Sequence, residues 1–126
     1  MAAGRWHLRY CRLWQEHEPF VRFQVEHIIP QKHGGSDALG NLALACYFCN
    51  THKSSNLTEI DPQTKRIVRL FNPRRHRWER HFRWKGVVIV GKTAIGRATV
   101  RVFGMNLSER VALRETLLQL GQWPYE

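Results

Sequence analysis

The chain has 126 residues, 43% of them hydrophobic, which suits one domain with a packed core and excludes a protein disordered by composition. No apolar run reaches the roughly 20 residues that a membrane-spanning helix needs. Twenty Lys and Arg against ten Asp and Glu give a net charge of +10, which indicates a polyanionic partner, nucleic acid before an anionic membrane surface.

The first part of the chain predicts two strands and a helix arranged around a glycine loop. Apolar alternation and β-branched side chains indicate strands, while Gly34-Gly35-Ser36-Asp37 indicates a loop. In chain order we expect a strand at 21–29 that ends at Pro30, a loop at 31–40, a strand at 42–45 and a helix from 46 to about 55. This order is a ββα unit.

The second part predicts a turn, two short strands and three helices. The elements are a turn at 61–64, a strand at 66–71, a helix at 73–84 with Asn72 as N-cap, a strand at 87–90, a helix at 93–103 with Thr93 as N-cap, and a helix at 108–120 capped by Ser108. Alternation within 93–103 also suits a strand, but the cap residue favours a helix. In the last helix Leu113, Leu117 and Leu120 share one side.

A series of polar residues has the types that phosphodiester hydrolysis needs. Hydrolysis requires a base that deprotonates water and a cation that neutralises the transition state. His27 stands near the predicted end of a strand, where its ring can be held with one nitrogen facing water. The glycine loop lets the chain turn back, so that the following helix can bring Asn50 against Glu26 as oxygen ligands for a hard divalent ion.

These residues resemble the motif of the HNH endonucleases: Glu26-His27-Ile-Ile-Pro, Gly-Gly, Asn41-Leu, then Cys-x-x-Cys-Asn50-x-x-Lys53. The resemblance implies that His27 is the catalytic base and that Asn41 pins the loop which positions it. It also implies that Glu26 and Asn50 hold one divalent metal, Mg²⁺ or Mn²⁺, with Zn²⁺ or Ni²⁺ as alternatives. Asp is commoner where Glu26 stands, which leaves the identity of the metal open.

The resemblance also implies the fold. We expect an α+β protein with a ββα-metal (HNH, His-Me finger) core, additional C-terminal helices and short strands. The boundaries predicted are a single domain at 1–126, a core at 20–56 and a basic C-terminal extension at 57–126 packed on the core. Parts of 70–99 look like the tail of small stand-alone bacterial HNH proteins.

Three cysteines raise the question of a structural zinc site. An odd number of cysteines argues against a disulfide framework. HNH relatives often carry two Cys-x-x-Cys pairs that bind zinc, but here Leu8 stands where the first cysteine would be. Three alternatives stay open: zinc on Cys11, Cys46, Cys49 and His7; a weak three-ligand site; or no zinc, with the cysteines packed as apolar groups.

Basic residues gather between positions 65 and 85, with aromatic residues among them. The residues predicted to contact DNA phosphates are Lys53, Arg74, Arg75 and Arg77. The alternative interpretation is an amphipathic helix whose aromatic face covers the core and whose charged face is solvated. The two interpretations are compatible because they use different faces.

The sequence thus predicts a cytoplasmic, metal-dependent HNH endonuclease that hydrolyses DNA, with no signal peptide and no membrane partner. An alternative is a non-enzymatic nucleic-acid-binding module with a degenerate zinc knuckle. A second is a redox protein that uses Cys46 and Cys49 as a dithiol. The oligomeric state is left open.

Overall fold

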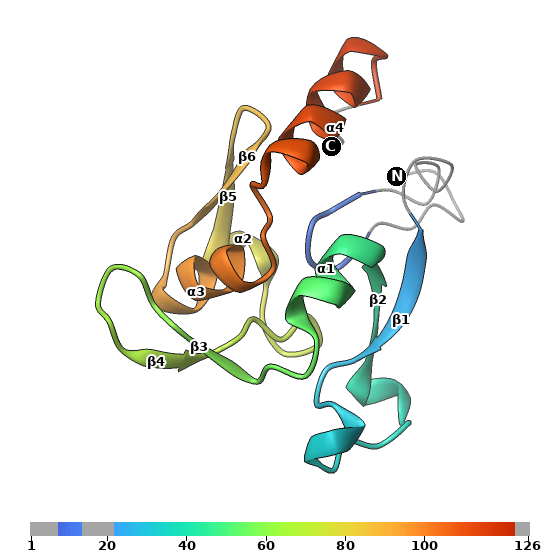
Figure 1. The fold of residues 1–126 in the computed structure, drawn as a ribbon, viewed down its shortest axis with the longest axis vertical. Coiled ribbons are helices and arrows are strands. Elements are labelled where there is room, and N and C mark those ends of the chain that lie inside the picture. The colour runs from blue at the N-terminus through green and yellow to red at the C-terminus, as the bar shows by residue number, and fades with distance from the viewer. Residues whose placement is uncertain (1–7, 14–21, 123–126) are drawn as a thin grey trace.

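The computed structural model describes residues 8–13 and 22–122, and its mixture of helices and strands is an α+β fold (Figure 1). The strands are β1 (Phe23–His27), β2 (Leu42–Cys46), β3 (Thr58–Ile60), β4 (Ile67–Arg69), β5 (Phe82–Lys85) and β6 (Val88–Gly91). The helices are α1 (Tyr47–Lys53), α2 (Trp78–His81), α3 (Ala94–Val102) and α4 (Ser108–Gln119), with short 3-10 turns at Gln31–His33 and Leu39–Asn41. Within the described residues, no helix has the length and apolar character to cross a membrane.

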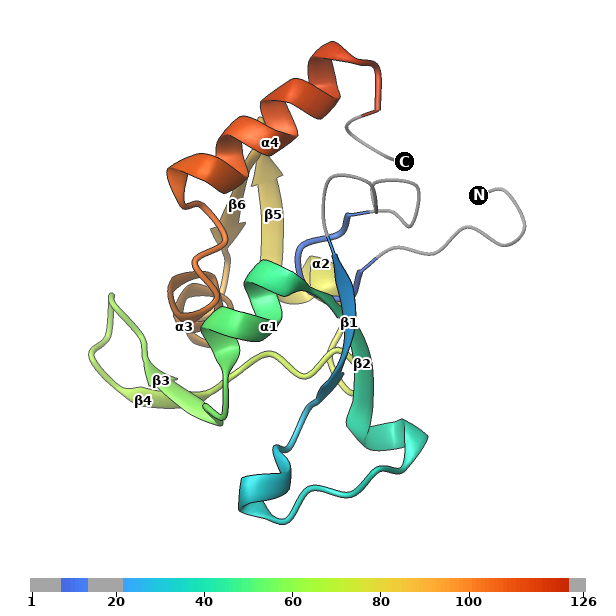
Figure 2. The ribbon, with the colours of Figure 1, turned by 45° about the vertical axis from the view of Figure 1, so that its right-hand side comes forward.

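The strands pair into three separate antiparallel hairpins, β1–β2, β3–β4 and β5–β6. In the first, Glu26 pairs with Ala43 and His27 with Leu42. Helix α1 continues directly from β2 and lies between this hairpin and α3 (Figures 1 and 2). The predicted order of strand, loop, strand and helix is therefore confirmed, and it places the motif residues on one hairpin and the helix that packs on it.

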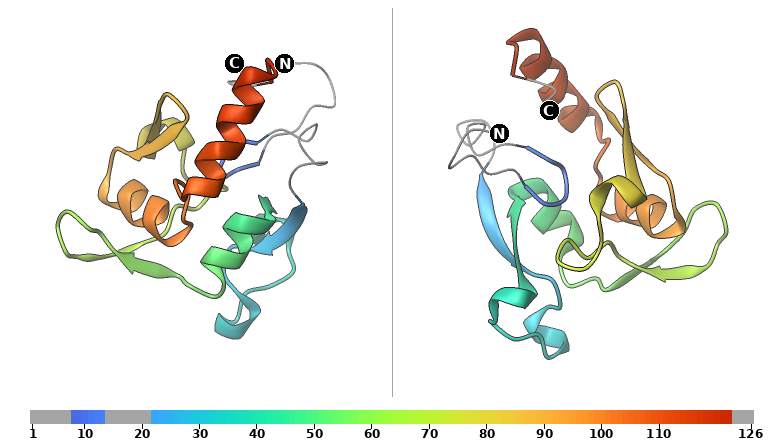
Figure 3. Two further views of the ribbon diagram at one scale, coloured as in Figure 1. Left: turned by 45° about the horizontal axis from the view of Figure 1, so that its top comes forward. Right: turned by 180° about the vertical axis from the view of Figure 1, so that it is seen from behind.

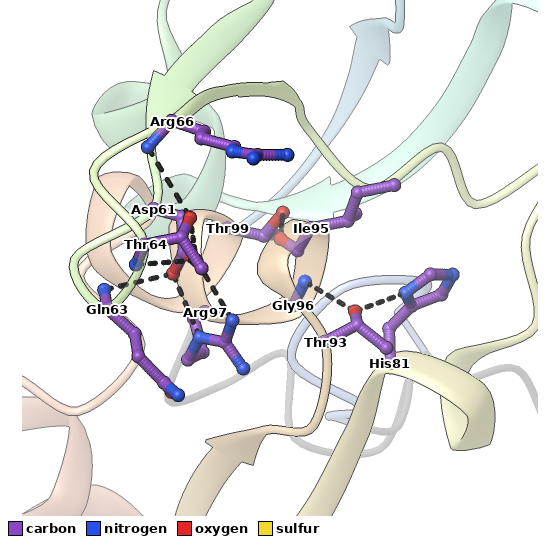
Figure 4. A network of polar contacts seen from close by, with 10 residues as sticks. All are labelled: Asp61, Gln63, Thr64, Arg66, His81, Thr93, Ile95, Gly96, Arg97 and Thr99. Carbon is purple, nitrogen blue, oxygen red and sulfur yellow. Dashed lines mark hydrogen bonds and ion pairs between the residues drawn. The ribbon is translucent and has the colours of Figure 1, made fainter.

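The predicted turn at 61–64 is confirmed, and Asp61 builds it. Its carboxylate accepts hydrogen bonds from the backbone N–H groups of Gln63 and Thr64. The Arg97 guanidinium binds both carboxylate oxygens, at 2.8 and 2.9 Å, and so ties the β3–β4 turn to α3 (Figure 4). Asp61 has no exposed surface, so the pair compensates a buried charge.

The predicted helix at 73–84 is wrong for most of its length. Asn72 does begin a turn, since its side chain accepts from the N–H of Arg74, but the turn does not propagate. The helix α2 covers only four residues, and the chain becomes strand β5 at Phe82. Trp78 and Phe82 still pack together, with ring centroids 5.2 Å apart, because α2 places them one helical turn apart and the Phe82 N–H donates to the Trp78 carbonyl oxygen. Tertiary packing and pairing with β6 override the helical pattern here.

The predicted helix at 93–103 is confirmed as α3, and the Thr93 side chain accepts from the N–H of Gly96 as an N-cap. Gly96 is required because a Cβ there would lie 2.0 Å from the carbonyl oxygen of His81. Helix α4 also forms as predicted, but Ser108 does not cap it: Leu107 holds that position without a side-chain bond. Leu120 is exposed, so the predicted leucine side was wrong at its end.

Two arginines complete the buried side of α4, together with Leu117. Arg114 is 2% exposed, and its guanidinium donates to the carbonyl oxygens of Val87 and Met105. These bonds hold α4 beside the turn of the β5–β6 hairpin (Figure 3). The C-terminal helix is therefore attached to the rest of the chain through buried cations as well as through apolar packing.

Candidate active site at the end of β1

The strand β1 directs Glu26 and His27 to opposite faces, because successive side chains of a strand alternate. Glu26 faces inward and is 3% exposed. The side chain of His27 is 30% exposed. The two adjacent residues of the motif therefore lie in different environments.

The His27 imidazole contacts a carboxylate from the glycine loop. Its Nε2 lies 2.8 Å from Oδ1 of Asp37, and Gln31 donates to the same oxygen at 3.2 Å. These two hydrogen bonds lower the pKa of Asp37, so the carboxylate is ionised near neutral pH. An ionised carboxylate only accepts, which requires that Nε2 carries the hydrogen and leaves Nδ1 as the basic nitrogen of neutral His27.

Asn41 holds together the loop that follows His27. Its Oδ1 accepts from the N–H of Ile29 at 2.8 Å, and its Nδ2 donates to the carbonyl oxygens of Ile29 and Ser36 at 3.0 and 2.7 Å. The backbone passes very close at Gly35, where a Cβ would lie 1.6 Å from the Ile29 carbonyl oxygen. The loop therefore needs both the amide of Asn41 and a residue without a side chain at position 35.

Glu26 is enclosed by partners from two other segments. Tyr10 donates its hydroxyl to Oε2 at 2.5 Å, and the Lys53 ammonium lies 2.6 Å from Oε1. Oε1 has no further hydrogen bond, so the ion pair alone satisfies it. Burial raises the pKa of Glu26, although Lys53 and Tyr10 act to lower it.

Lys53 is 2% exposed and also donates to the carbonyl oxygens of His27 and Ile28, at 3.3 and 3.1 Å. The phosphate contact that the sequence predicts for Lys53 does not agree with this geometry, because the buried ammonium group binds partners inside the protein. Lys53 instead links the buried carboxylate to the end of β1, where His27 stands.

The predicted metal ligands Glu26 and Asn50 share the interface between β1 and α1, but their side chains bind other residues. Asn50 donates through Nδ2 to the Gln24 side chain at 2.6 Å. At Glu26 the Lys53 ammonium already occupies the position that a cation would take, and the carboxylate has almost no access to water. A hard divalent ion that keeps water ligands does not fit these residues as they stand.

The segment that carries these motif residues matches a known protein family. Residues 9–56 match the family model of the HNH endonucleases. The chain contains an HNH domain. Among curated proteins and among solved structures, no match was found. The motif residues from Glu26 to Lys53 all lie within the matched segment.

The three cysteines of the HNH domain form one buried cluster. Cys11, Cys46 and Cys49 are reduced and at most 1% exposed, and their sulfurs lie within 4.8 Å of one another. Tetrahedral zinc with Zn–S bonds near 2.3 Å separates its sulfurs by about 3.8 Å, which compares with 3.7 Å between Cys11 and Cys46. The cluster can therefore supply three ligands to a metal such as zinc.

A fourth ligand is missing among the described residues. Leu8, three residues before Cys11, is fully buried and apolar. His7, predicted as the alternative ligand, lies outside the described residues. Arg110 of α4 instead contacts the cluster: its Nη2 donates to Cys49 Sγ at 3.2 Å and to Cys46 Sγ at 3.5 Å.

The nine basic residues of the segment 65–85 are all exposed: Lys65, Arg66, Arg69, Arg74, Arg75, Arg77, Arg80, Arg83 and Lys85. The aromatic residues among them are buried or half-buried. Arg74 bridges to the HNH hairpin, since its Nε donates to the carbonyl oxygen of Leu42 at 2.9 Å, and Leu42 is the strand partner of His27. The sequence prediction of separate charged and apolar surfaces is confirmed, although the helix that was expected to carry them is short.

Sequence reasoning missed Tyr10, Asp37 and Arg110. Asp37 and Tyr10 have no spacing that links them to the motif, because the loop and the N-terminal segment set their positions. Arg110 had a detectable signal: it is three and seven residues before Leu113 and Leu117, on the side predicted to be buried.

Proposed function

We propose that this protein is an endonuclease that hydrolyses DNA phosphodiester bonds, with His27 as the general base. The observation that carries the proposal is the environment of His27 inside an HNH domain. The imidazole is half-exposed at the end of β1, and its Nε2 bonds the Asp37 carboxylate. Asp37 fixes the tautomer, so that Nδ1 takes the proton from the attacking water.

Asn41 and Lys53 are positioning residues in this proposal. Asn41 bonds the loop on the C-terminal side of His27, and Lys53 bonds the backbone carbonyl oxygen of His27 itself. Both act through the backbone and neither touches the reacting atoms. A base held in this way loses little conformational entropy when the substrate binds.

The exposed basic residues bind the DNA backbone. Arg74 supplies positive charge beside the reacting phosphate, since it is bonded to the strand partner of His27. Arg75 and Arg77 contact neighbouring phosphates without reading bases. Residues 1–126 then act as one domain, with 57–126 packed on the 20–56 core, and the bonds of Arg74 and Arg110 across this boundary support that arrangement.

The dependence on a divalent metal stays a prediction from the family. Because Glu26 is closed by Lys53 and Tyr10, no step of the proposed reaction is assigned to a metal on Glu26 and Asn50. Cleavage measured with Mg²⁺, Mn²⁺ or EDTA tests the dependence directly.

The experiment is cleavage of supercoiled plasmid by the wild type and by His27→Ala, at low and moderate salt. His33→Ala is the matched control, because His33 is an exposed histidine six residues away whose ring bonds the Ser55 carbonyl oxygen rather than a carboxylate. We expect nicking by the wild type and by the control, and none by His27→Ala, with equal retardation of the plasmid in a gel. Equal turnover by His27→Ala would refute the assignment.

A second candidate function is a nucleic-acid-binding module without catalysis. The closed Glu26–Lys53 pair favours it, because the position expected to hold a metal is filled by a lysine. This function predicts that the wild type retards plasmid but never cuts it under any metal condition. Metal-dependent or metal-independent nicking that requires His27 excludes it.

A further inference from the structure

The strongest unexplained feature is a buried cation beside three buried sulfurs. Arg110 is 3% exposed, although a charged side chain is almost never fully buried without compensation. Its Nη1 donates to the Phe103 carbonyl oxygen at 3.0 Å, and its Nη2 donates to the sulfurs of Cys46 and Cys49. The Phe48 ring lies against the guanidinium, 5.5 Å from its carbon.

Within the described part of the chain, no carboxylate lies within ion-pair distance of Arg110. The cysteine sulfurs are therefore its polar partners on one side and backbone carbonyl oxygens on the other. A structural zinc ion would bring two positive charges into the same cluster. It would also need a fourth ligand where Leu8 supplies only an apolar side chain.

We propose that Arg110 replaces zinc at the cysteine cluster, so that the cluster is a metal-free pin between α4 and the HNH domain. Zinc sites of this kind join an N-terminal segment to a helix by binding sulfurs from both. Here the guanidinium donates to two of the sulfurs, and Cys11 lies against Cys46 at 3.7 Å. The pin thus joins three segments: the stretch that contains Cys11, the start of α1, and α4.

The proposal accounts for two features of the chain together. The apolar Leu8 leaves a three-sulfur cluster, and Arg110 adds a positive charge without requiring a fourth sulfur. Arginine suits this role better than lysine, because its planar fork can donate to two sulfurs and to a carbonyl oxygen at once. A metal-free cluster of this kind stabilises the fold whether or not the protein cleaves DNA.

The first test is the metal content of the full chain, purified without chelator and analysed by mass spectrometry, together with its melting temperature with and without a strong chelator. We expect no tightly bound zinc and no change in melting temperature. Cobalt(II) should give no cobalt–thiolate absorption. One zinc per chain, or a melting temperature that falls when chelator is added, overturns the proposal.

The second test separates a pin from an arginine that merely fills space. Arg110→Met should lower the melting temperature strongly, whereas Arg101→Met, an exposed arginine on α3, should not. The double variant Leu8→Cys with Arg110→Met should bind one zinc and become sensitive to chelator. A wild-type melting temperature in Arg110→Met overturns the proposal even if the wild type holds no zinc.

Discussion

Glu26 and His27 are neighbours in one motif, but they lie on opposite faces of β1 and in different chemical environments. On the inner face Glu26 is sealed by Tyr10 and Lys53, with 3% of its surface exposed. On the outer face His27 is half-exposed, and its carboxylate partner Asp37 comes from a surface loop. One face therefore stabilises the strand end, and the other is available to react.

This difference shows that adjacency in a motif does not imply a shared role. Strand alternation separates the two side chains, and the lysine one helical turn after Asn50 then decides what Glu26 can do. A buried carboxylate that is paired with a lysine stabilises the fold, and its charge is not available to a metal ion.

The largest effect is expected on the inner face. Lys53→Met leaves the Glu26 carboxylate buried without a counter-charge, which should cost about 3–5 kcal/mol of unfolding free energy. Urea unfolding monitored by tryptophan fluorescence measures it. Lys32→Met, at an exposed lysine, should leave the midpoint almost unchanged. If the unfolding midpoint of Lys53→Met changes as little as that of Lys32→Met, the buried ion pair does not exist.

A second buried carboxylate, Asp61, provides a reference with the opposite pH dependence. Hydrogen bonds from Arg97 and Thr64 hold the pKa of Asp61 well below its ordinary value. The stabilisation of the fold by ionised Asp61 is therefore present above the ordinary pKa of an aspartate and is lost as the pH falls below that value. Burial raises the pKa of Glu26, so the contribution of Glu26 to the free energy of unfolding instead decreases as the pH rises above its ordinary pKa.

Between pH 7 and pH 3, the unfolding midpoint should thus fall less steeply with decreasing pH in Asp61→Asn than in the wild type. Asp61→Asn should also be less stable than the wild type at neutral pH, by less than Lys53→Met. The slope of the wild type should persist in Glu59→Gln, a control on the adjacent strand β3. Identical acid slopes in wild type and Asp61→Asn would contradict the ion pair with Arg97.

On the outer face, Asp37→Asn should reduce kcat/KM about tenfold, equivalent to about 1.4 kcal/mol of transition-state stabilisation. The amide keeps the shape but removes the charge that fixes the His27 tautomer. Rates on a nicked-plasmid assay across pH measure the change. Glu109→Gln, at an exposed acid on α4, should retain the full rate. A full rate in Asp37→Asn would contradict this role, because the charge of Asp37 would then not be needed to orient the His27 imidazole.

The smallest effect concerns the exposed arginines. Arg75→Ala should weaken DNA binding about equally on all sequences and reduce the slope of affinity against salt concentration by about one. Fluorescence anisotropy at several salt concentrations measures both quantities. A change in affinity confined to one sequence would indicate base reading rather than a phosphate contact.

The sequence could predict what depends on local pattern. Alternation and the glycine loop located β1, β2 and α1, and Thr93 marked the start of α3. The sequence could not predict that residues after Phe82 form a strand, because that choice depends on pairing with β6. The closure of Glu26 also depends on Tyr10, which reaches it from 16 residues away.

The most direct test of the central claim compares plasmid cleavage by His27→Ala with cleavage by the paired variant Glu26→Gln with Lys53→Leu, which neutralises the inner face without leaving an unpaired charge. Circular dichroism and urea unfolding first establish that both are folded. Our account predicts no cleavage by His27→Ala at any metal concentration, and cleavage by the paired variant within about tenfold of the wild type. A folded paired variant as inactive as His27→Ala would contradict the account, because the inner face, through Glu26 or Lys53, would then be needed for more than positioning His27.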